Sequence, residues 1–163
     1  LAKNPQNKFL GVCWMQGEFD LMTSDYASHT QHFNHMVEAF RRDLKQYHSQ
    51  LNNITDAPWF CGDTTWYWKE NFPHSYEAIY GNYQNNVLAN IIFVDFQQQG
   101  ERGLTNAPDE DPDDLSTGYY GSAYRSPENW TTALRSSHFS TAARRGIISD
   151  RFVEAILQFW RER

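Results

Sequence analysis

Three short apolar runs, separated by stretches with helical periodicity, constrain the fold of this chain more than any other sequence feature. The runs cover residues 9–15, 59–63 and 90–96, and their length and residue types are typical of strands. Between them, apolar residues recur at helical spacing over residues 30–48 and 76–88. Strands that alternate with helices form parallel sheets joined by right-handed crossovers. The sequence therefore predicts an α/β fold.

The segments outside this pattern read as loops and one final helix. Residues 64–73 (TTWYWKENFP) predict an aromatic loop, and residues 97–134 predict a long loop rich in Gly, Pro, Ser and Asp. The acidic run at 109–114 lacks the glycine-punctuated pattern of an EF-hand, so we expect a solvated loop there rather than a calcium site. An amphipathic helix is predicted from about Ser140, which is a good N-cap residue.

Three strands are few for a parallel sheet, and they would leave an apolar edge unpaired. The first residues, LAKNPQNK, resemble the end of a helix and a loop. We therefore expect residues 1–163 to form the C-terminal half of a single larger α/β domain. On this hypothesis the N-terminal half of the same domain is a partner of the chain.

Composition and charge argue against several classes of partner. The chain has 163 residues, of which 40% are hydrophobic, and this is enough for one domain with a core. Its formal net charge is −6 without a run of Lys or Arg, so neither nucleic acid nor an anionic membrane is an expected partner. No segment approaches the length of apolar sequence that spans a bilayer.

We expect Cys13 and Cys61 to be buried thiols, with a disulfide as the alternative if their strands are neighbours.

The first predicted strand ends in the polar stretch QGEFD. The amide of Gln16 can donate to an oxyanion, and Gly17 allows a sharp turn or a close approach to a ligand. Glu18 and Asp20 can hold a base or bind a polar substrate. The alternative is a tight turn with solvated acids.

Histidines occur at two places where they could carry chemistry. His138 directly precedes the predicted N-cap of the last helix, and the ordinary pKa of histidine suits a general base; the alternative is a surface histidine at a helix start. His29, His32 and His35 recur every three residues, but no cysteine or acid is placed to complete a tetrahedral zinc site. We expect these three to form a solvated helix start and predict no metal.

Two stretches resemble blocks of the SGNH-hydrolase superfamily, in its sialate O-acetylesterase and acetylxylan-esterase branch. CWMQGEFD resembles the W-x-Q-G-E-x-D block, and SSHFSTAARRGI resembles the D-x-x-H-x-S block that precedes a helix, with about 120 residues between them. The resemblance extends over all 163 residues. It implies a three-layer, flavodoxin-like fold with a central parallel sheet.

The same resemblance implies an activity and a cellular location. Members hydrolyse O-acetyl esters with a serine nucleophile, a histidine base and an oxyanion hole, without a metal or other cofactor. The implied reaction removes the 9-O-acetyl group from N-acetyl-9-O-acetylneuraminic acid. Its alternatives are an acetylxylan-type polysaccharide esterase and an inactive carbohydrate-binding fragment. We expect a bacterial periplasmic location, because acetylated sialic acids arrive from outside the cell.

Site residues follow from the match to the two blocks. His138 matches the catalytic histidine, and Gln16 matches the amide that binds the oxyanion. Arg135 stands where the family has its acid, so we expect a backbone carbonyl to orient His138, with Glu18 or Asp20 as the alternatives. Arg135 is then expected to bind the sialic-acid carboxylate, as a guanidinium does bidentately. Glu18 is also a predicted substrate-binding residue.

Two further features complete the sequence-based picture of the site. The family's nucleophile motif, G-x-S, is missing at its expected setting. Gly121-Ser122 imitates it in a loop without a strand–turn–helix context, so we expect the serine to lie outside this chain. Trp66 follows the second strand and is predicted to line a sugar-binding pocket, with packing as a local lid as the alternative.

Overall fold

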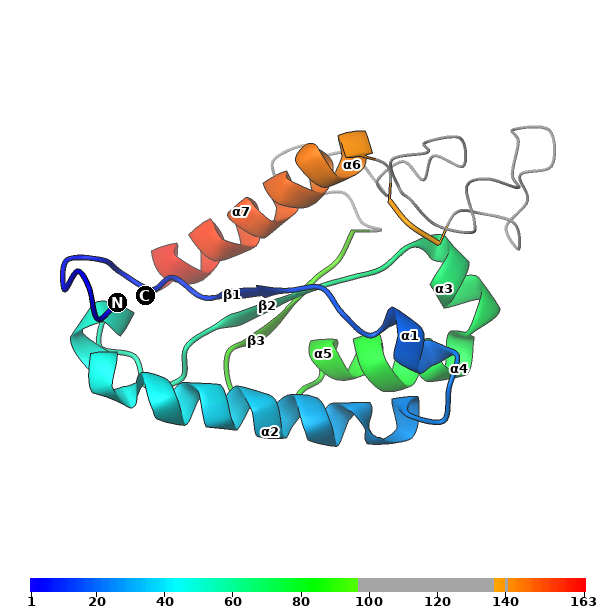
Figure 1. Cartoon of the computed structure of the whole chain (residues 1–163). Helices are drawn as coiled ribbons and strands as arrows, with labels where there is room; N and C mark the ends of the chain where they lie inside the picture. The colour runs from blue at the N-terminus through cyan, green and yellow to red at the C-terminus, as the bar shows by residue number, and fades with distance from the viewer. Residues whose placement is uncertain (97–136, 140) are drawn as a thin grey trace.

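The sheet of this protein is parallel and has the order β1-β2-β3. The computed structural model describes residues 1–96, 137–139 and 141–163, and Figure 1 shows their arrangement. The strands are β1 (Val12–Trp14), β2 (Trp59–Gly62) and β3 (Ile91–Val94). Val12 pairs with Trp59, which in turn pairs with Ile91. The predicted α/β fold with a parallel sheet is confirmed.

Helices connect the strands as the periodicity predicts, with different bounds. β1 is followed by α1 (Glu18–Leu21), α2 (Tyr26–Leu44) and the 3-10 helix η1 (Lys45–Leu51). β2 is followed by α3 (Trp66–Asn71), α4 (Pro73–Tyr76), the π-helical η2 (Glu77–Gly81) and α5 (Asn82–Gln84). The last described elements are α6 (Thr141–Arg145) and α7 (Ile147–Arg161). No helix within the described ranges is both long and apolar enough to cross a bilayer.

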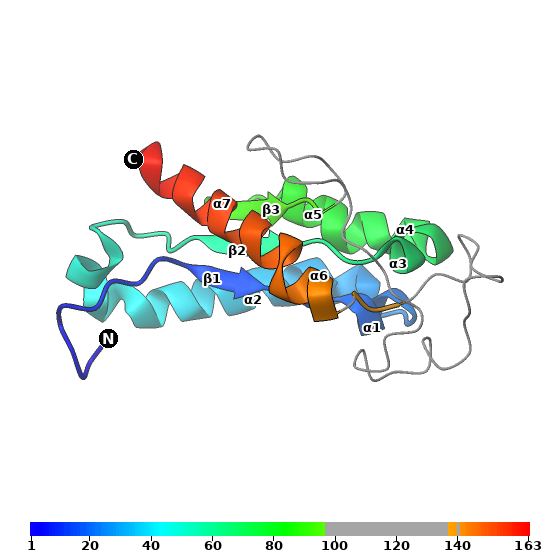
Figure 2. The ribbon, with the colours of Figure 1, turned by 90° about the horizontal axis from the view of Figure 1, so that it is seen from above.

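The sheet lies between two helical layers. Figures 1 and 2 show α7 on one face and α2 with α5 on the other. Successive residues of β2 point to opposite faces, as the pleat requires. Trp59 and Cys61 join the core under α2, which includes Phe33. Phe60 joins the core under α7, which includes Phe152. Burial on both faces explains why β2 is apolar throughout.

Two predicted segments differ from the structure. Residues 64–73 are not a loop, because α3 and the start of α4 lie there. Trp68 is buried in α3, and Pro73 occupies the first turn of α4, where its missing N–H costs nothing. The predicted C-terminal helix is divided into α6 and α7 at Gly146, whose backbone is not helical. Ser140 lies outside the described residues.

The two cysteines lie on adjacent strands but on opposite faces of the sheet. Cys13 pairs with Phe60, while Cys61 pairs with Trp14, one residue further along. Both thiols are free, so the disulfide alternative is wrong. The prediction that both are buried is wrong for Cys13, which is exposed. The reason is that α7 packs on β2 and β3, whereas Cys13 lies on the outer strand β1.

Candidate active site

A glycine in a restricted conformation follows β1 and directs the chain into α1. Gly17 has a φ of 133°, a backbone conformation that residues with a side chain rarely adopt. A Cβ built there would lie 3.0 Å from Cγ2 of Ile79 and 3.4 Å from the hydroxyl oxygen of Tyr80. The close packing of this turn places Gln16 and Glu18 at the carboxyl end of the sheet. Ligand sites of open α/β sheets lie at this edge.

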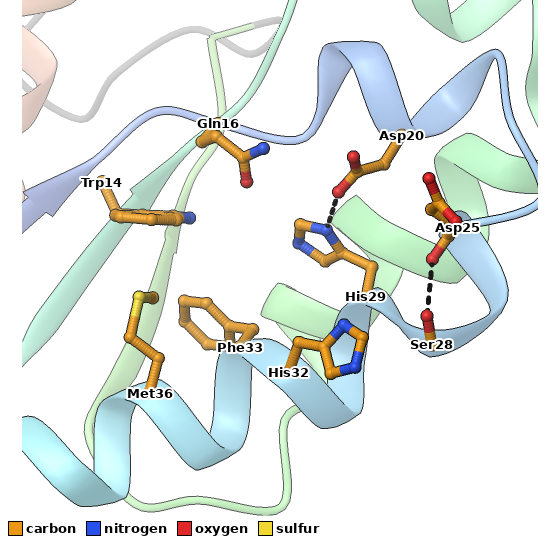
Figure 3. Close-up of a pocket in the computed structure, with 9 residues that line it drawn as sticks. All are labelled: Trp14, Gln16, Asp20, Asp25, Ser28, His29, His32, Phe33 and Met36. Atoms are coloured by element: carbon orange, nitrogen blue, oxygen red, sulfur yellow. Dashed lines mark hydrogen bonds and ion pairs between the residues drawn. The ribbon is translucent and has the colours of Figure 1, made fainter.

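Gln16 is exposed and borders a cavity of about 520 Å³ between the end of β1 and the start of α2. Figure 3 shows its amide directed into the same space as the side chains of Asp20 and His29. The cavity is lined by Trp14, Gln16, Asp20, Asp25, Ser28, His29, His32, Phe33 and Met36. An exposed amide beside an aromatic and polar cavity can donate to an oxyanion or to a polar ligand.

His29 is buried in a hydrogen-bonded network, which corrects its predicted place at a solvated helix start. It is 6% exposed, its Nδ1 lies 2.6 Å from Oδ2 of Asp20, and its Nε2 lies 2.8 Å from the hydroxyl of Tyr83. The prediction fails because His29 lies on the side of α2 that meets Tyr83 of α5, whereas His32 and His35 are exposed. The sequence showed that Asp20 ends the polar stretch QGEFD, but no sequence spacing indicates that its carboxylate bonds His29.

Glu18 connects the ends of two strands. Its Oε1 accepts a hydrogen bond of 2.6 Å from the hydroxyl of Thr64, which follows β2. Burial raises the pKa of Glu18, and the Thr64 hydrogen bond partly opposes this. Glu18 and Asp20, the two acids considered as partners for His138, thus each bond another side chain. A backbone carbonyl stays our predicted support for His138.

Asp63 is a buried acid just beyond β2, and sequence reasoning gave it no role. It is 2% exposed, and its Oδ1 accepts hydrogen bonds from the hydroxyl of Tyr76 at 2.7 Å and the N–H of Thr64 at 2.8 Å. Its Oδ2 is buried without a hydrogen-bond partner among the described residues. Burial raises the pKa of Asp63 to about 6. The run WFCGD showed an acid at the strand end, but not its burial.

His138 lies between two anchored neighbours. The carbonyl of Ser137 accepts a hydrogen bond of 2.8 Å from the indole of Trp68, and the ring of Phe139 packs against Phe96. Figure 1 shows residues 137–139 beside α3, at the carboxyl end of the sheet. Partial burial lowers the pKa of His138, and the charge of Arg144 lowers it further. The imidazole is therefore neutral near pH 7 and able to accept a proton.

The other predicted site residues have different settings. Trp66 is partly exposed at the start of α3, where the Lys69 ammonium lies 5.0 Å from its ring centroid. Trp68, rather than Trp66, is the buried tryptophan of this aromatic segment. Arg135, the rejected nucleophile Ser122 and the acidic run at 109–114 lie outside the described residues.

These features define an α/β protein with a polar site and a neutral histidine at the carboxyl edge of a parallel sheet. No family model matches the chain. It is 99% identical over 163 residues to a protein of Escherichia coli (strain K12) named "Probable 9-O-acetyl-N-acetylneuraminic acid deacetylase". This confirms the predicted resemblance to a sialate O-acetylesterase.

A solved structure, described as "Crystal structure of NanS", is also similar. Its TM-score is 0.75, with 94% sequence identity over 100% of this chain. The chain covers 50% of the E. coli protein and 50% of the crystallised chain. It thus spans about half the length of the relatives that it matches.

Proposed function

We propose that this chain provides the base and one oxyanion donor of an esterase that removes the 9-O-acetyl group from N-acetyl-9-O-acetylneuraminic acid. The observation that carries the proposal is the 99% identity, over the whole chain, to half of a protein named for that deacetylation. The positions of Gln16 and His138 at the carboxyl end of the sheet support it.

The proposed reaction has two steps. His138 takes the proton of a serine hydroxyl as the serine oxygen bonds to the acetyl carbon, and the Gln16 amide stabilises the oxyanion that forms. The sugar hydroxyl leaves with the proton from His138, and the acetyl group stays on the serine. Water then attacks this ester with His138 as base, which releases acetate and restores the serine. The neutral imidazole and the exposed amide are the states that these roles need.

The nucleophilic serine is proposed to lie in the other half of the full-length relative, docked along β1. β1 is an outer strand of the described sheet. Apolar side chains beside it are exposed: Leu10 by 49%, Met15 by 47% and Phe19 by 61%. Exposed apolar side chains next to an edge strand are typical of a surface that another segment covers. We propose that the remaining half of the relative covers this surface.

The remaining roles are proposed from chemistry. Arg135 binds the sialic-acid carboxylate, and Trp66, with its partly exposed ring, contacts the sugar. Glu18 is proposed to bind the substrate, and the hydrogen bond from the Thr64 hydroxyl holds its carboxylate in place. We further propose that the enzyme works in the bacterial periplasm, where acetylated sialic acid from outside the cell is first met.

The experiment that tests this function is acetate release from 9-O-acetylated N-acetylneuraminic acid. The chain is assayed by itself and after addition of the remaining half of the E. coli relative. We expect release only after addition, and its loss in His138→Ala. His35→Ala, at an exposed position of α2, is the matched control and keeps activity.

Three outcomes would overturn parts of the proposal. Activity of the chain by itself, lost in Ser122→Ala, would place the nucleophile in this chain. Preference for acetylated xylan would change the substrate class. Sugar binding without acetate release from the combined halves would indicate a carbohydrate-binding protein.

A further inference from the structure

The hydroxyl of Tyr83 is bonded to three polar groups behind the predicted oxyanion donor. The indole N–H of Trp14 donates to it at 3.1 Å, and Nε2 of His29 lies 2.8 Å away. The hydroxyl in turn donates to the main-chain carbonyl of Gln16 at 3.2 Å. Nδ1 of His29 is bonded to Asp20 at 2.6 Å. The network therefore connects Asp20 to the backbone of Gln16.

Counting protons shows what this network requires. A phenol oxygen has one proton to donate and two lone pairs. If the proton goes to the Gln16 carbonyl, the lone pairs can accept from Trp14 and from an N–H at Nε2 of His29. Nδ1 faces the Asp20 carboxylate, so both ring nitrogens of His29 act as donors in this arrangement. If Nε2 instead accepted the Tyr83 proton, the Gln16 carbonyl would be left without this bond.

Tyr83 is itself held firmly in the core and can therefore hold the backbone of Gln16 in place. It is 1% exposed, and its ring packs against Phe33 with the ring centroids 4.9 Å apart and against Tyr80 at 5.7 Å. Burial raises the pKa of its hydroxyl, which therefore keeps its proton. Gln16, by contrast, has an exposed side chain and precedes the positive-φ turn at Gly17. Its backbone needs support from the core to hold the amide in one place.

We propose that Tyr83 is a positioning residue, which fixes the backbone of Gln16 so that its amide meets the developing oxyanion. The Asp20–His29 pair directs the Tyr83 proton toward Gln16. This inference rests on the proposed function, because it assigns the purpose of a network behind the proposed site. It differs from a packing role in one respect, namely that Tyr83 acts on the reaction through Gln16.

A double-mutant cycle in the full-length E. coli relative tests this, with Tyr83→Phe, Gln16→Ala and both together. Phe keeps the packed ring and removes the hydroxyl. We expect Tyr83→Phe to lower kcat about tenfold with little change in KM, the effect of one ordinary hydrogen bond lost in the transition state. In the Gln16→Ala background the same change should have no further effect, because residues that act through one group are non-additive. Tyr47→Phe, which removes a phenol oxygen in η1, is the control.

A second measurement does not depend on activity. Relaxation of the ¹⁵N-labelled Gln16 side-chain amide should show greater mobility in Tyr83→Phe and unchanged mobility in Tyr47→Phe. An equal loss of kcat in both backgrounds, or an amide as rigid as before, would overturn the positioning role. If the unsubstituted protein released no acetate, the proposed function would fail, and amide mobility would still decide whether Tyr83 positions Gln16.

Discussion

The hydroxyl of Tyr76 donates a hydrogen bond of 2.7 Å to the Oδ1 atom of Asp63, a carboxylate that is 2% exposed just beyond β2. A second hydrogen bond reaches the same oxygen from the N–H of Thr64. The other oxygen is buried without a partner among the described residues. Desolvation exceeds the effect of the two hydrogen bonds, and the pKa of Asp63 is raised to about 6.

Ionisation of Asp63 as the pH rises should lower the free energy of unfolding. Its pKa is about 6 in the folded chain, compared with about 3.9 in an unfolded one. A raised carboxyl pKa favours the folded state at low pH, and this contribution disappears as the pH rises from about 4 to 6. The difference is about 3 kcal/mol. Urea unfolding at pH 4 and pH 7 should show that Asp63→Asn weakens this pH dependence.

Asp43→Asn is the control for that measurement, because the Asp43 side chain is 76% exposed. It should leave the pH dependence as it is in the original chain. The same pH dependence in Asp63→Asn and the original chain would contradict the raised pKa.

Replacing Gly17 by alanine should destabilise the fold by about 1–3 kcal/mol, because its φ of 133° strains any side chain and the new Cβ would press on Ile79. Thermal or urea unfolding measures the loss. Gly81→Ala is the matched control: Gly81 has helical angles, and a Cβ there would meet only the end of the flexible Glu77 side chain among the nearest atoms. Equal losses in the two variants would argue against strain at Gly17.

The rate of deacetylation should depend on the protonation of His138. Its pKa is lowered by burial and by Arg144, so the acidic limb of the kcat/KM profile should have its midpoint below the ordinary histidine value of about 6.5. Arg144→Ala removes a positive charge and should move the midpoint toward higher pH. Arg145→Ala, at an exposed neighbouring position, should move it less. A midpoint above 6.5 in the original protein would be inconsistent with this environment.

Thiol labelling should report the docking surface along β1. Cys13 is exposed and should react with a thiol reagent in the folded chain, whereas Cys61 is buried and should react only after unfolding. Burial also raises the pKa of Cys61, which further slows its reaction. Addition of the remaining half of the relative should protect Cys13. Unchanged labelling of Cys13 in an active complex would show that this part of β1 is not covered.

Substrate variants should separate the proposed sugar contacts from packing. Trp66→Ala and Arg135→Ala should raise KM for the sialylated ester, with little effect on a small acetyl ester that has neither ring nor carboxylate. Steady-state kinetics on both substrates measures this. An equal loss on both esters would favour a packing role for Trp66, and an unchanged KM for the sialylated ester would exclude carboxylate binding by Arg135.

The central architecture could be predicted because its signals are local. β2 is a short apolar run and α2 has apolar residues at helical spacing, and both patterns depend on nearest neighbours in the chain. Polar residues directly after β1 and β2 likewise indicated the edge of the sheet where a site would lie. The bounds of α3 and the division between α6 and α7 were missed, because aromatic and glycine-containing segments give ambiguous local signals.

Sequence by itself thus determined the α/β class, the parallel sheet of a βαβαβ chain and the polar edge that contains Gln16. Only the tertiary structure decided which side chains meet at that edge. His29 is bonded to Asp20, nine positions earlier, and to Tyr83, 54 positions later. The exposure of Cys13 and the raised pKa of Asp63 likewise depend on which distant elements cover them. Burial and hydrogen-bond partners come from segments far apart in the chain, so no local pattern specifies them.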